Sequence, residues 1–104
     1  MYWFYLTIAI LLEVGGTVCM KLSDSFANLV PSVLVFVLYG ASFALMMVTL
    51  RGLDLAIVYG VWSGAGTAAI AIIGVVSFGE SMTLVRAFSL GLVVIGVVGL
   101  KLSA

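Results

Sequence analysis

The sequence predicts an all-α membrane protein with four transmembrane helices per chain. Of its 104 residues, 65% are hydrophobic and only 8% are charged, whereas a soluble domain is about half apolar and about a quarter charged. A transmembrane helix needs about 20 predominantly apolar residues. The length therefore allows four spans and leaves little chain for a domain outside the membrane. We expect a single four-helix transmembrane domain over residues 1–104.

Short polar segments separate the four expected spans. The first span covers about residues 3–20 and the second about residues 30–50. Pro31 then falls in the first turn of the second span, where a helix does not need the N–H that proline lacks. The third span covers about residues 55–78 and the fourth about residues 84–102. The N-terminal segment lacks the basic stretch and small-residue cleavage site of a signal peptide, so we expect the first span to remain as a helix.

The composition argues against several classes of function. The formal net charge is zero, so no basic surface is expected to bind nucleic acid. Histidine is absent and there is one cysteine, which removes the usual zinc sites, the histidine-dependent catalytic sets and any disulfide framework. Cys19 is interpreted as a small apolar residue of a helix. We expect no enzyme activity, no metal site and no organic cofactor.

Glu13 is the one charged residue expected deep in the membrane. Seven of the eight charged side chains fall at or near the ends of the spans. A carboxylate in hydrocarbon costs several kcal/mol unless it is protonated, paired or facing a wet cavity. No Lys, Arg or His falls in the middle of any span to pair with it. Glu13 is therefore expected to bind a proton part of the time, or a cation from outside. A neutral structural acid between helices is the alternative.

The helix face around Glu13 carries small residues. Gly16 and Thr17 lie three and four positions further along, on the same side of the helix. A face of small residues indicates either tight helix packing or open volume beside the acid. The first span alone leaves both interpretations open.

A polar and aromatic stripe runs along the third span. Its members recur at spacings of three and four, and they are Tyr59, Trp62, Ser63, Gly66 and Thr67. Tyr59 is near enough to the span end to be an interfacial anchor, but Trp62 lies deeper than the usual aromatic belt. Aromatic walls beside an anionic group suit organic cations. Gly64 and Gly66 weaken the helix locally and mark a candidate hinge.

The second and fourth spans carry fewer signals. Tyr39, Ser42 and Phe43 share one face of the second span, where the two hydroxyls either hydrogen-bond the acid or pack in the core. In the fourth span, Ser89 and Gly96 are small residues seven positions apart. That spacing is typical of a helix–helix contact, and we assign it to dimerisation.

The loop charges give almost no preferred orientation in the membrane. Lys21 and Arg86 flank one side of the four-span arrangement, whereas Arg51 and Lys101 flank the other. The excess of Lys and Arg that normally keeps one side in the cytoplasm is therefore absent. Two copies in opposite orientations would form an inverted pair like the inverted repeats of many transporters. We expect an antiparallel dimer with one Glu13 from each copy at a shared site.

The motifs together resemble those of the small multidrug resistance family. The matching stretches cover nearly the whole chain, and they are Glu13-Val-Gly-Gly-Thr17, Met20-Lys-Leu-Ser23, Pro31-Ser32, Tyr39-Gly-Ala-Ser-Phe43 and Tyr59-Gly-Val-Trp-Ser-Gly-Ala-Gly66. The resemblance implies a multi-pass protein of the bacterial inner membrane that exports cations in exchange for protons as an antiparallel dimer. It also implies that Glu13 binds proton and substrate in turn, with Tyr59, Trp62, Tyr39 and Ser42 lining the site.

The resemblance leaves the substrate class open among several branches. Gly16-Thr17 is similar to the branch that exports quaternary ammonium and aromatic cations, which is our main expectation. Gly99-Leu-Lys101 is similar to the guanidinium-exporting branch, which tends to carry Trp in place of Gly16. Asp54 is similar to some paired-subunit members, including polyamine exporters, and Ser25 replaces the family's usual loop glycine. The alternatives are a guanidinium or polyamine exporter, one subunit of a heterodimeric exporter, a regulatory partner, or a lipid-carrier flippase.

Overall fold

The helices of the computed structural model coincide with the expected spans. The structure describes residues 1–103, and in this part the chain forms four helices and no strand: α1 (Tyr2–Leu22), α2 (Leu29–Thr49), α3 (Leu55–Phe78) and α4 (Leu84–Ser103). Each begins and ends within two residues of the expected span. At 1.5 Å per residue, helices of 20 to 24 residues are long enough to cross a hydrocarbon core of about 30 Å. The prediction of an all-α membrane protein with four spans is confirmed.

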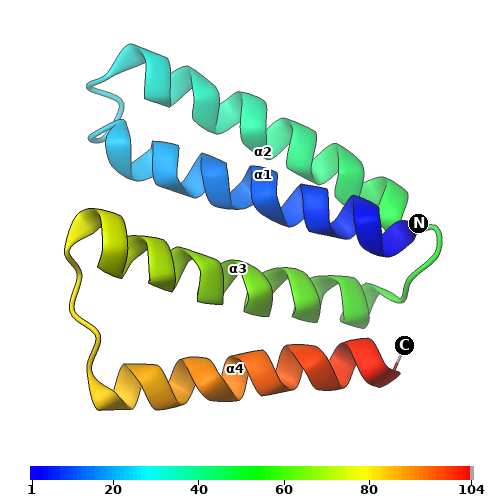
Figure 1. Cartoon of the computed structure of the whole chain (residues 1–104). Helices are drawn as coiled ribbons and strands as arrows, with labels where there is room; N and C mark the ends of the chain where they lie inside the picture. Colours follow the sequence, from blue (N-terminus) through cyan, green and yellow to red (C-terminus); the bar gives the residue numbers. More distant parts are fainter. Residues whose placement is uncertain (104) are drawn as a thin grey trace. The chain divides into compact units, whose positions relative to one another are not determined.

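The chain divides into two helical hairpins. The first unit is Met1–Leu53 and the second is Asp54–Ala104. In the first, α1 packs against α2, and in the second, α3 packs against α4 (Figure 1). Each hairpin is described by itself below. The expectation that both belong to one domain stays a prediction.

Small side chains bring α1 and α2 close together. The buried positions of the two helices include only one side chain larger than valine, and they are Leu6, Ala9, Val14 and Gly16 on α1, and Ser32, Val35, Ser42 and Thr49 on α2. The three buried residues with a hydroxyl group are Ser32, Ser42 and Thr49. Each hydroxyl donates to a backbone carbonyl, so burial leaves none of them unsatisfied. Among them, Ser42 Oγ donates to the carbonyl of Ala9 across the hairpin, at 2.7 Å.

The connection between α1 and α2 is tightly wound. Asp24, Ser25 and Phe26 have φ angles of 48°, 57° and 70°, in the left-handed region that costs an ordinary residue about 1–2 kcal/mol. Asn28 Nδ2 donates to the carbonyl of Leu22 at 2.8 Å and closes the turn. Ser25 thus adopts the left-handed backbone conformation that glycine favours, although it is not a glycine.

Glycines on α3 allow α4 to approach. A methyl group built on Gly60 would lie 2.5 Å from Leu100 Cδ1, and one on Gly64 would collide with Val97 Cγ2. α3 is one continuous helix from Leu55 to Phe78, so Gly64 lies at a packing contact in this conformation. The hinge predicted at Gly64 and Gly66 stays a prediction. Gly79, with φ at 67°, ends α3 in a left-handed cap.

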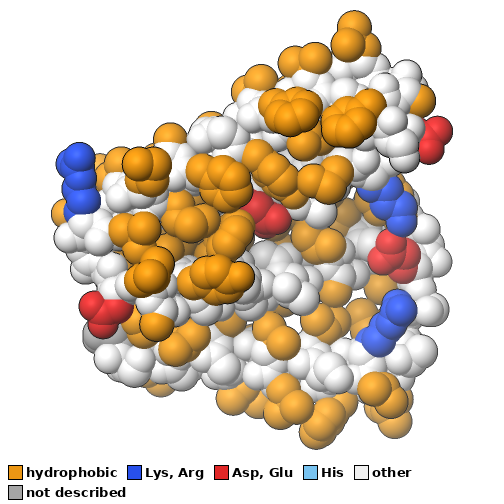
Figure 2. All heavy atoms as spheres, turned by 180° about the vertical axis from the view of Figure 1, so that it is seen from behind, with side chains coloured by type: hydrophobic (Ala, Val, Ile, Leu, Met, Phe, Trp, Pro, Cys, Tyr) orange, Lys and Arg blue, Asp and Glu red, His pale blue; other side chains and the backbone are white. Residues whose placement is uncertain are grey.

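The outer face of α4 has no neighbour within its own hairpin. No residue of α4 within residues 84–103 is buried. Ser89 and Gly96 are exposed, and a methyl group built on Gly96 would meet nothing within 4 Å. Figure 2 shows apolar side chains over broad areas of the face in view, which is the surface that lipid or another helix covers in a membrane. The dimer contact at Ser89 and Gly96 stays a prediction.

Candidate functional site

Glu13 stands close to the middle of α1, at one end of a chain of hydroxyl groups. Thr17, one helical turn further on, donates from Oγ1 to Glu13 Oε1 at 2.9 Å. The same Thr17 Oγ1 lies 2.6 Å from the hydroxyl oxygen of Tyr39 on α2. A threonine hydroxyl has a single hydrogen, and here it is directed at Glu13. The Tyr39 hydroxyl therefore donates to Thr17, and the chain runs from Tyr39 through Thr17 to Glu13.

The hydroxyl groups of Thr17 and Tyr39 provide Glu13 with polar partners inside the hydrocarbon layer. Glu13 is partly buried, and an ionised carboxylate can accept about four hydrogen bonds through its two oxygens. Thr17 uses one of these positions on Oε1. The remaining positions, including those on Oε2, can accept a proton or the N–H groups of a cation. The arrangement can therefore exchange one bound positive charge for another.

Gly16 makes room for the Tyr39 ring. Gly16 is buried, and a methyl group built on it would lie 2.5 Å from Cδ1 and 2.6 Å from Cε1 of Tyr39. No real Cβ approaches another carbon so closely, so the ring lies directly over the glycine. Of the two interpretations of the small face beside Glu13, Gly16 fits tight packing. The neighbouring Gly15 differs, because its methyl group would only touch Leu38 at 3.4 Å.

We expect Gly16→Ala to disrupt the hydroxyl chain, whereas Gly15→Ala should be tolerated. The added methyl group displaces the Tyr39 ring, and overpacking of this kind costs about 1–3 kcal/mol. The free energy of unfolding in detergent and the rate of cation transport should both fall for Gly16→Ala. Adding Tyr39→Phe should reduce transport little further, because the hydroxyl contact is already lost. Equal behaviour of the two alanine variants would contradict this account.

Ser42 serves a structural contact in this conformation. Its side chain is fully buried, and its hydroxyl hydrogen is donated to the carbonyl of Ala9, one turn before Glu13. Of the two roles considered for this hydroxyl, the structure therefore favours packing over a bond to the acid. Tyr39 contacts Phe43, with ring centroids 6.1 Å apart. The part of Ser42 in substrate binding stays a prediction.

In the second hairpin, α3 carries an aromatic corner. The rings of Tyr59 and Trp62 meet edge to face, with centroids 5.8 Å apart and planes at 88°. Tyr59 is 61% exposed, whereas Trp62 and Ser63 are partly buried and Gly66 is buried. The carbonyl of Ser63 accepts a hydrogen bond from Thr67 Oγ1 at 2.7 Å. The stripe predicted from the sequence thus contains a real aromatic contact.

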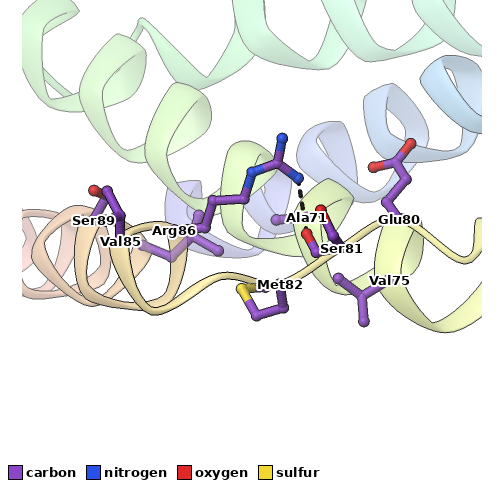
Figure 3. A pocket seen from close by; sticks show the side chains of 9 residues that line it. Ala71, Val75, Glu80, Ser81, Met82, Val85, Arg86 and Ser89 are labelled. Carbon is purple, nitrogen blue, oxygen red and sulfur yellow. Dashed lines mark hydrogen bonds between the residues drawn. The ribbon is translucent and has the colours of Figure 1, made fainter.

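The predicted site residues fall into two groups, one in each hairpin. Glu13, Gly16, Thr17 and Tyr39 are brought together by α1 and α2. The aromatic corner belongs to the other unit, and its place beside Glu13 stays a prediction. Sequence reasoning missed a cavity at the C-terminal end of α3 (Figure 3). Its only signal in the sequence is that two charged residues, Glu80 and Arg86, are close together in the chain.

Comparison with known proteins identifies the family. The family model described as Small Multidrug Resistance protein matches residues 1–93. The chain belongs to the Small Multidrug Resistance family. Like other members it is a membrane transporter and not an enzyme, and it is a multi-pass protein of the bacterial inner membrane.

Several relatives match over nearly the whole chain. A guanidinium exporter of Yersinia pseudotuberculosis is 41% identical over 104 residues, which is all of both chains. A guanidinium exporter of Escherichia coli K12 is 42% identical over 103 residues, covering 99% of this chain and 98% of its own length. An uncharacterized membrane protein, YvaE of Bacillus subtilis, is 43% identical over 102 residues, covering 98% of this chain and 86% of its own. The Yersinia and Escherichia relatives are named for guanidinium, not for the quaternary ammonium compounds of our main expectation.

Proposed function

We propose that the protein exports a small guanidinium-type cation in exchange for protons, with Glu13 binding each in turn. The observation that carries the proposal is a partly buried carboxylate near the middle of a transmembrane helix, hydrogen-bonded to a hydroxyl chain. Relatives named guanidinium exporters, about 41% identical over their full length, support the substrate class.

The exchange follows from competition for a single group. A carboxylate that has taken a proton is neutral and attracts a cation weakly, whereas an ionised one in a low-dielectric site attracts it strongly. Proton and substrate therefore occupy Glu13 alternately. If the loaded site opens to either side of the membrane and the empty, ionised site does not, an inward flow of protons drives an outward flow of substrate.

Guanidinium suits the groups available. It is planar and presents N–H donors in a fork that matches the two oxygens of a carboxylate. Thr17 engages Oε1 by one hydrogen bond only, so both oxygens keep positions for the fork. Guanidinium also stacks on aromatic faces, which the aromatic corner of Tyr59 and Trp62 offers. The residues assigned to binding are Glu13, Thr17, Tyr39, Tyr59, Trp62 and Ser63, with Gly16 and Ser42 shaping the hairpin around them.

The proposed assembly is a homodimer of two copies in opposite orientations. Lys21 and Arg86 balance Arg51 and Lys101, so insertion in both directions is expected. Two opposed copies would place a Glu13 and an aromatic corner from each chain around one site. A heterodimer with a sister chain is the alternative assembly.

Uptake into vesicles tests the function. The purified chain is reconstituted alone, and labelled guanidinium is supplied outside vesicles whose interior is acidic. We expect uptake that depends on the pH gradient and collapses when a protonophore removes it. Gradient-independent uptake would refute the exchange mechanism. Uptake of tetraphenylphosphonium without uptake of guanidinium would favour a second candidate function, the export of larger aromatic cations.

That second candidate is export of quaternary ammonium and aromatic cations. The observation that favours it is the exposed Tyr59 ring set against Trp62, because two aromatic faces suit a large apolar cation better than a small hydrated one.

Trp62→Leu is expected to separate the two substrate classes. Leucine keeps an apolar side chain but removes the aromatic face, and a desolvated cation–π contact is worth about 2 kcal/mol, or about thirty-fold in affinity. Tetraphenylphosphonium should lose about this much affinity and guanidinium less, measured by competition binding. Trp3→Leu, at the start of α1, is the matched control. An equal loss for both cations would mean that Trp62 only packs.

A further inference from the structure

The Thr17 hydroxyl lies between two other oxygen atoms of the first hairpin. Its Oγ1 is 2.9 Å from Glu13 Oε1 and 2.6 Å from the hydroxyl oxygen of Tyr39. A threonine hydroxyl has a single hydrogen. If Thr17 donates to one of these oxygens, the other group has to donate to Thr17. The two hydrogen bonds therefore run in the same direction, and a change at Glu13 can reach Tyr39 through Thr17.

The Tyr39 ring is held in place, whereas its hydroxyl hydrogen can rotate. The ring lies directly over Gly16, where a methyl group would approach Cδ1 to 2.5 Å. It also contacts the ring of Phe43, with the centroids 6.1 Å apart. A hydroxyl hydrogen turns about its C–O bond to suit its partners. Reversing the direction of the two hydrogen bonds thus needs two such rotations and no movement of a ring or a helix.

The charge on Glu13 decides the direction. An ionised carboxylate only accepts hydrogen bonds, so Thr17 donates to Oε1 and Tyr39 donates to Thr17. A carboxyl group with its proton on Oε1 instead donates to Thr17, and Thr17 then donates to Tyr39. A carboxylic acid is more acidic than a phenol and is therefore the stronger donor. The reversed direction satisfies the donor that is the more costly to leave unpaired in hydrocarbon.

Tyr39 is the titratable group that faces this arrangement from the neighbouring helix. Within α2 it is the one titratable side chain, and the helix carries no charged residue. On α1, Cys19 is two positions beyond Thr17 and does not share its face. Lys21 is about two helical turns beyond Glu13. Within this hairpin, the signal that Thr17 is placed to transmit is therefore the charge of Glu13.

We propose that Thr17 is a positioning residue that relays the charge state of Glu13 to the Tyr39 hydroxyl. The inference rests on the proposed function, in which Glu13 holds a proton and a cation in turn. With Glu13 ionised, the Tyr39 hydrogen is directed at Thr17, and the phenol oxygen keeps a lone pair that can accept an N–H of the cation. With Glu13 protonated, the Tyr39 hydrogen turns away from Thr17. No O–H bond of either hydroxyl breaks, and the added proton stays on the carboxyl group.

The relay makes the binding of proton and cation more exclusive. Tyr39 offers its oxygen to the cation while the carboxylate is charged. Once Glu13 has taken a proton, Tyr39 turns a hydrogen outwards, and this partial positive charge repels a cation. The protein thereby adds a second group to the exchange at the cost of two bond rotations.

Infrared spectroscopy of the Tyr39 side chain tests the relay, because the C–O stretch of a phenol differs between a hydroxyl that donates and one that accepts. Difference spectra are recorded between mildly alkaline and acidic samples of the full-length protein with isotope-labelled tyrosine and no cation present. The band that is missing from Tyr39→Phe is assigned to Tyr39. We expect this band to move from the donor position to the acceptor position on acidification. The shift should be lost in Thr17→Val and in Glu13→Gln.

Three further variants separate the relay from a packing role of Thr17. Thr17→Ser keeps the hydroxyl and should restore the shift. Thr17→Ala removes the hydroxyl with less bulk than valine, so the test does not depend on the folding of one variant. Thr7→Val is the matched control on the same helix, because the Thr7 hydroxyl donates to the carbonyl of Trp3 at 2.8 Å. It should behave as wild type.

A Tyr39 band that stays in place when the wild type is acidified would overturn the relay. A full shift in both Thr17→Val and Thr17→Ala would do the same. Proton release on adding guanidinium, recorded on the same preparations, separates this inference from the proposed function. Proton release together with a stationary Tyr39 band would refute the relay alone. The absence of both would refute the proposed exchange as well.

Discussion

Glu13→Gln is expected to abolish proton-coupled transport while leaving the fold intact. Glutamine has nearly the same shape, and its carbonyl oxygen can still accept the hydrogen bond from Thr17 that Glu13 Oε1 accepts now. It carries no ionisable proton and no charge, so neither competing state can form. Guanidinium uptake into acid-loaded vesicles should fall to the level of empty vesicles, with the unfolding transition unchanged.

Asp24→Asn is the matched control for this change. It makes the same carboxylate-to-amide substitution on an exposed residue of the connection between α1 and α2. Asparagine tolerates the left-handed backbone found there, so transport should be retained. A Glu13→Gln protein that still coupled cation uptake to the pH gradient would contradict the mechanism.

The same competition fixes the sign of the pH dependence. Proton and cation are proposed to compete for one carboxylate, so cation binding should weaken as the pH falls. In Glu13→Gln, any residual binding should be independent of pH. Binding isotherms at several pH values measure both effects. A wild-type affinity that stayed constant across the acid range would show that proton and cation do not share the carboxylate.

Two lysines added at the C-terminus are expected to inactivate the protein when it is expressed alone. The charges flanking the spans are balanced, with Lys21 and Arg86 against Arg51 and Lys101. A small excess of positive charge on one side of the spans should therefore hold all copies in one orientation. If the transport site is shared between opposed copies, no active dimer can form from copies that all point the same way.

Co-expression with an oppositely biased chain should restore activity. The partner carries two added lysines within residues 23–28, on the other side of the spans. Labelling of Ser103→Cys, in a background with Cys19→Ala, reports the orientation of each chain. Labelling from one side only in the chain with unaltered charges would rule out dual topology and point to a dedicated sister subunit.

The sequence was sufficient to predict the helices, because apolar run length determines where a membrane helix can begin and end. Seven of the eight charged residues lie near span ends, so they delimit the helices closely. The bond from Thr17 to Glu13 was also accessible, since residues four apart share a helix face. The depth of Glu13 in the membrane could be predicted from the bounds of the first span alone.

Contacts between helices were not accessible in the same way. The sequence left open whether Ser42 bonds the acid or packs, and the close approach of Ala9 decides where its hydrogen points in this conformation. The sequence indicates that Gly64 weakens its helix locally. Its contact with Val97, however, depends on how α4 packs against α3. The cavity beside Arg86 and Glu80 exists only because the connection folds back over the end of α3.

The substrate class was the main expectation that the comparisons did not support. Gly16-Thr17 is similar to the quaternary ammonium branch, whereas the Yersinia and Escherichia relatives are named guanidinium exporters. In the structure the space beside Gly16 is occupied by the Tyr39 ring. A glycine at this position therefore accommodates a side chain of the protein itself, and it is a poor guide to the size of the substrate.

The central claim is that one carboxylate exchanges a proton for a cation, and proton release on binding tests it most directly. The chain is purified alone in weakly buffered detergent, and guanidinium is added at several starting pH values while the pH is recorded. The account predicts acidification that saturates with guanidinium concentration and is absent in Glu13→Gln. Guanidinium binding detected by calorimetry without any release of protons would contradict it.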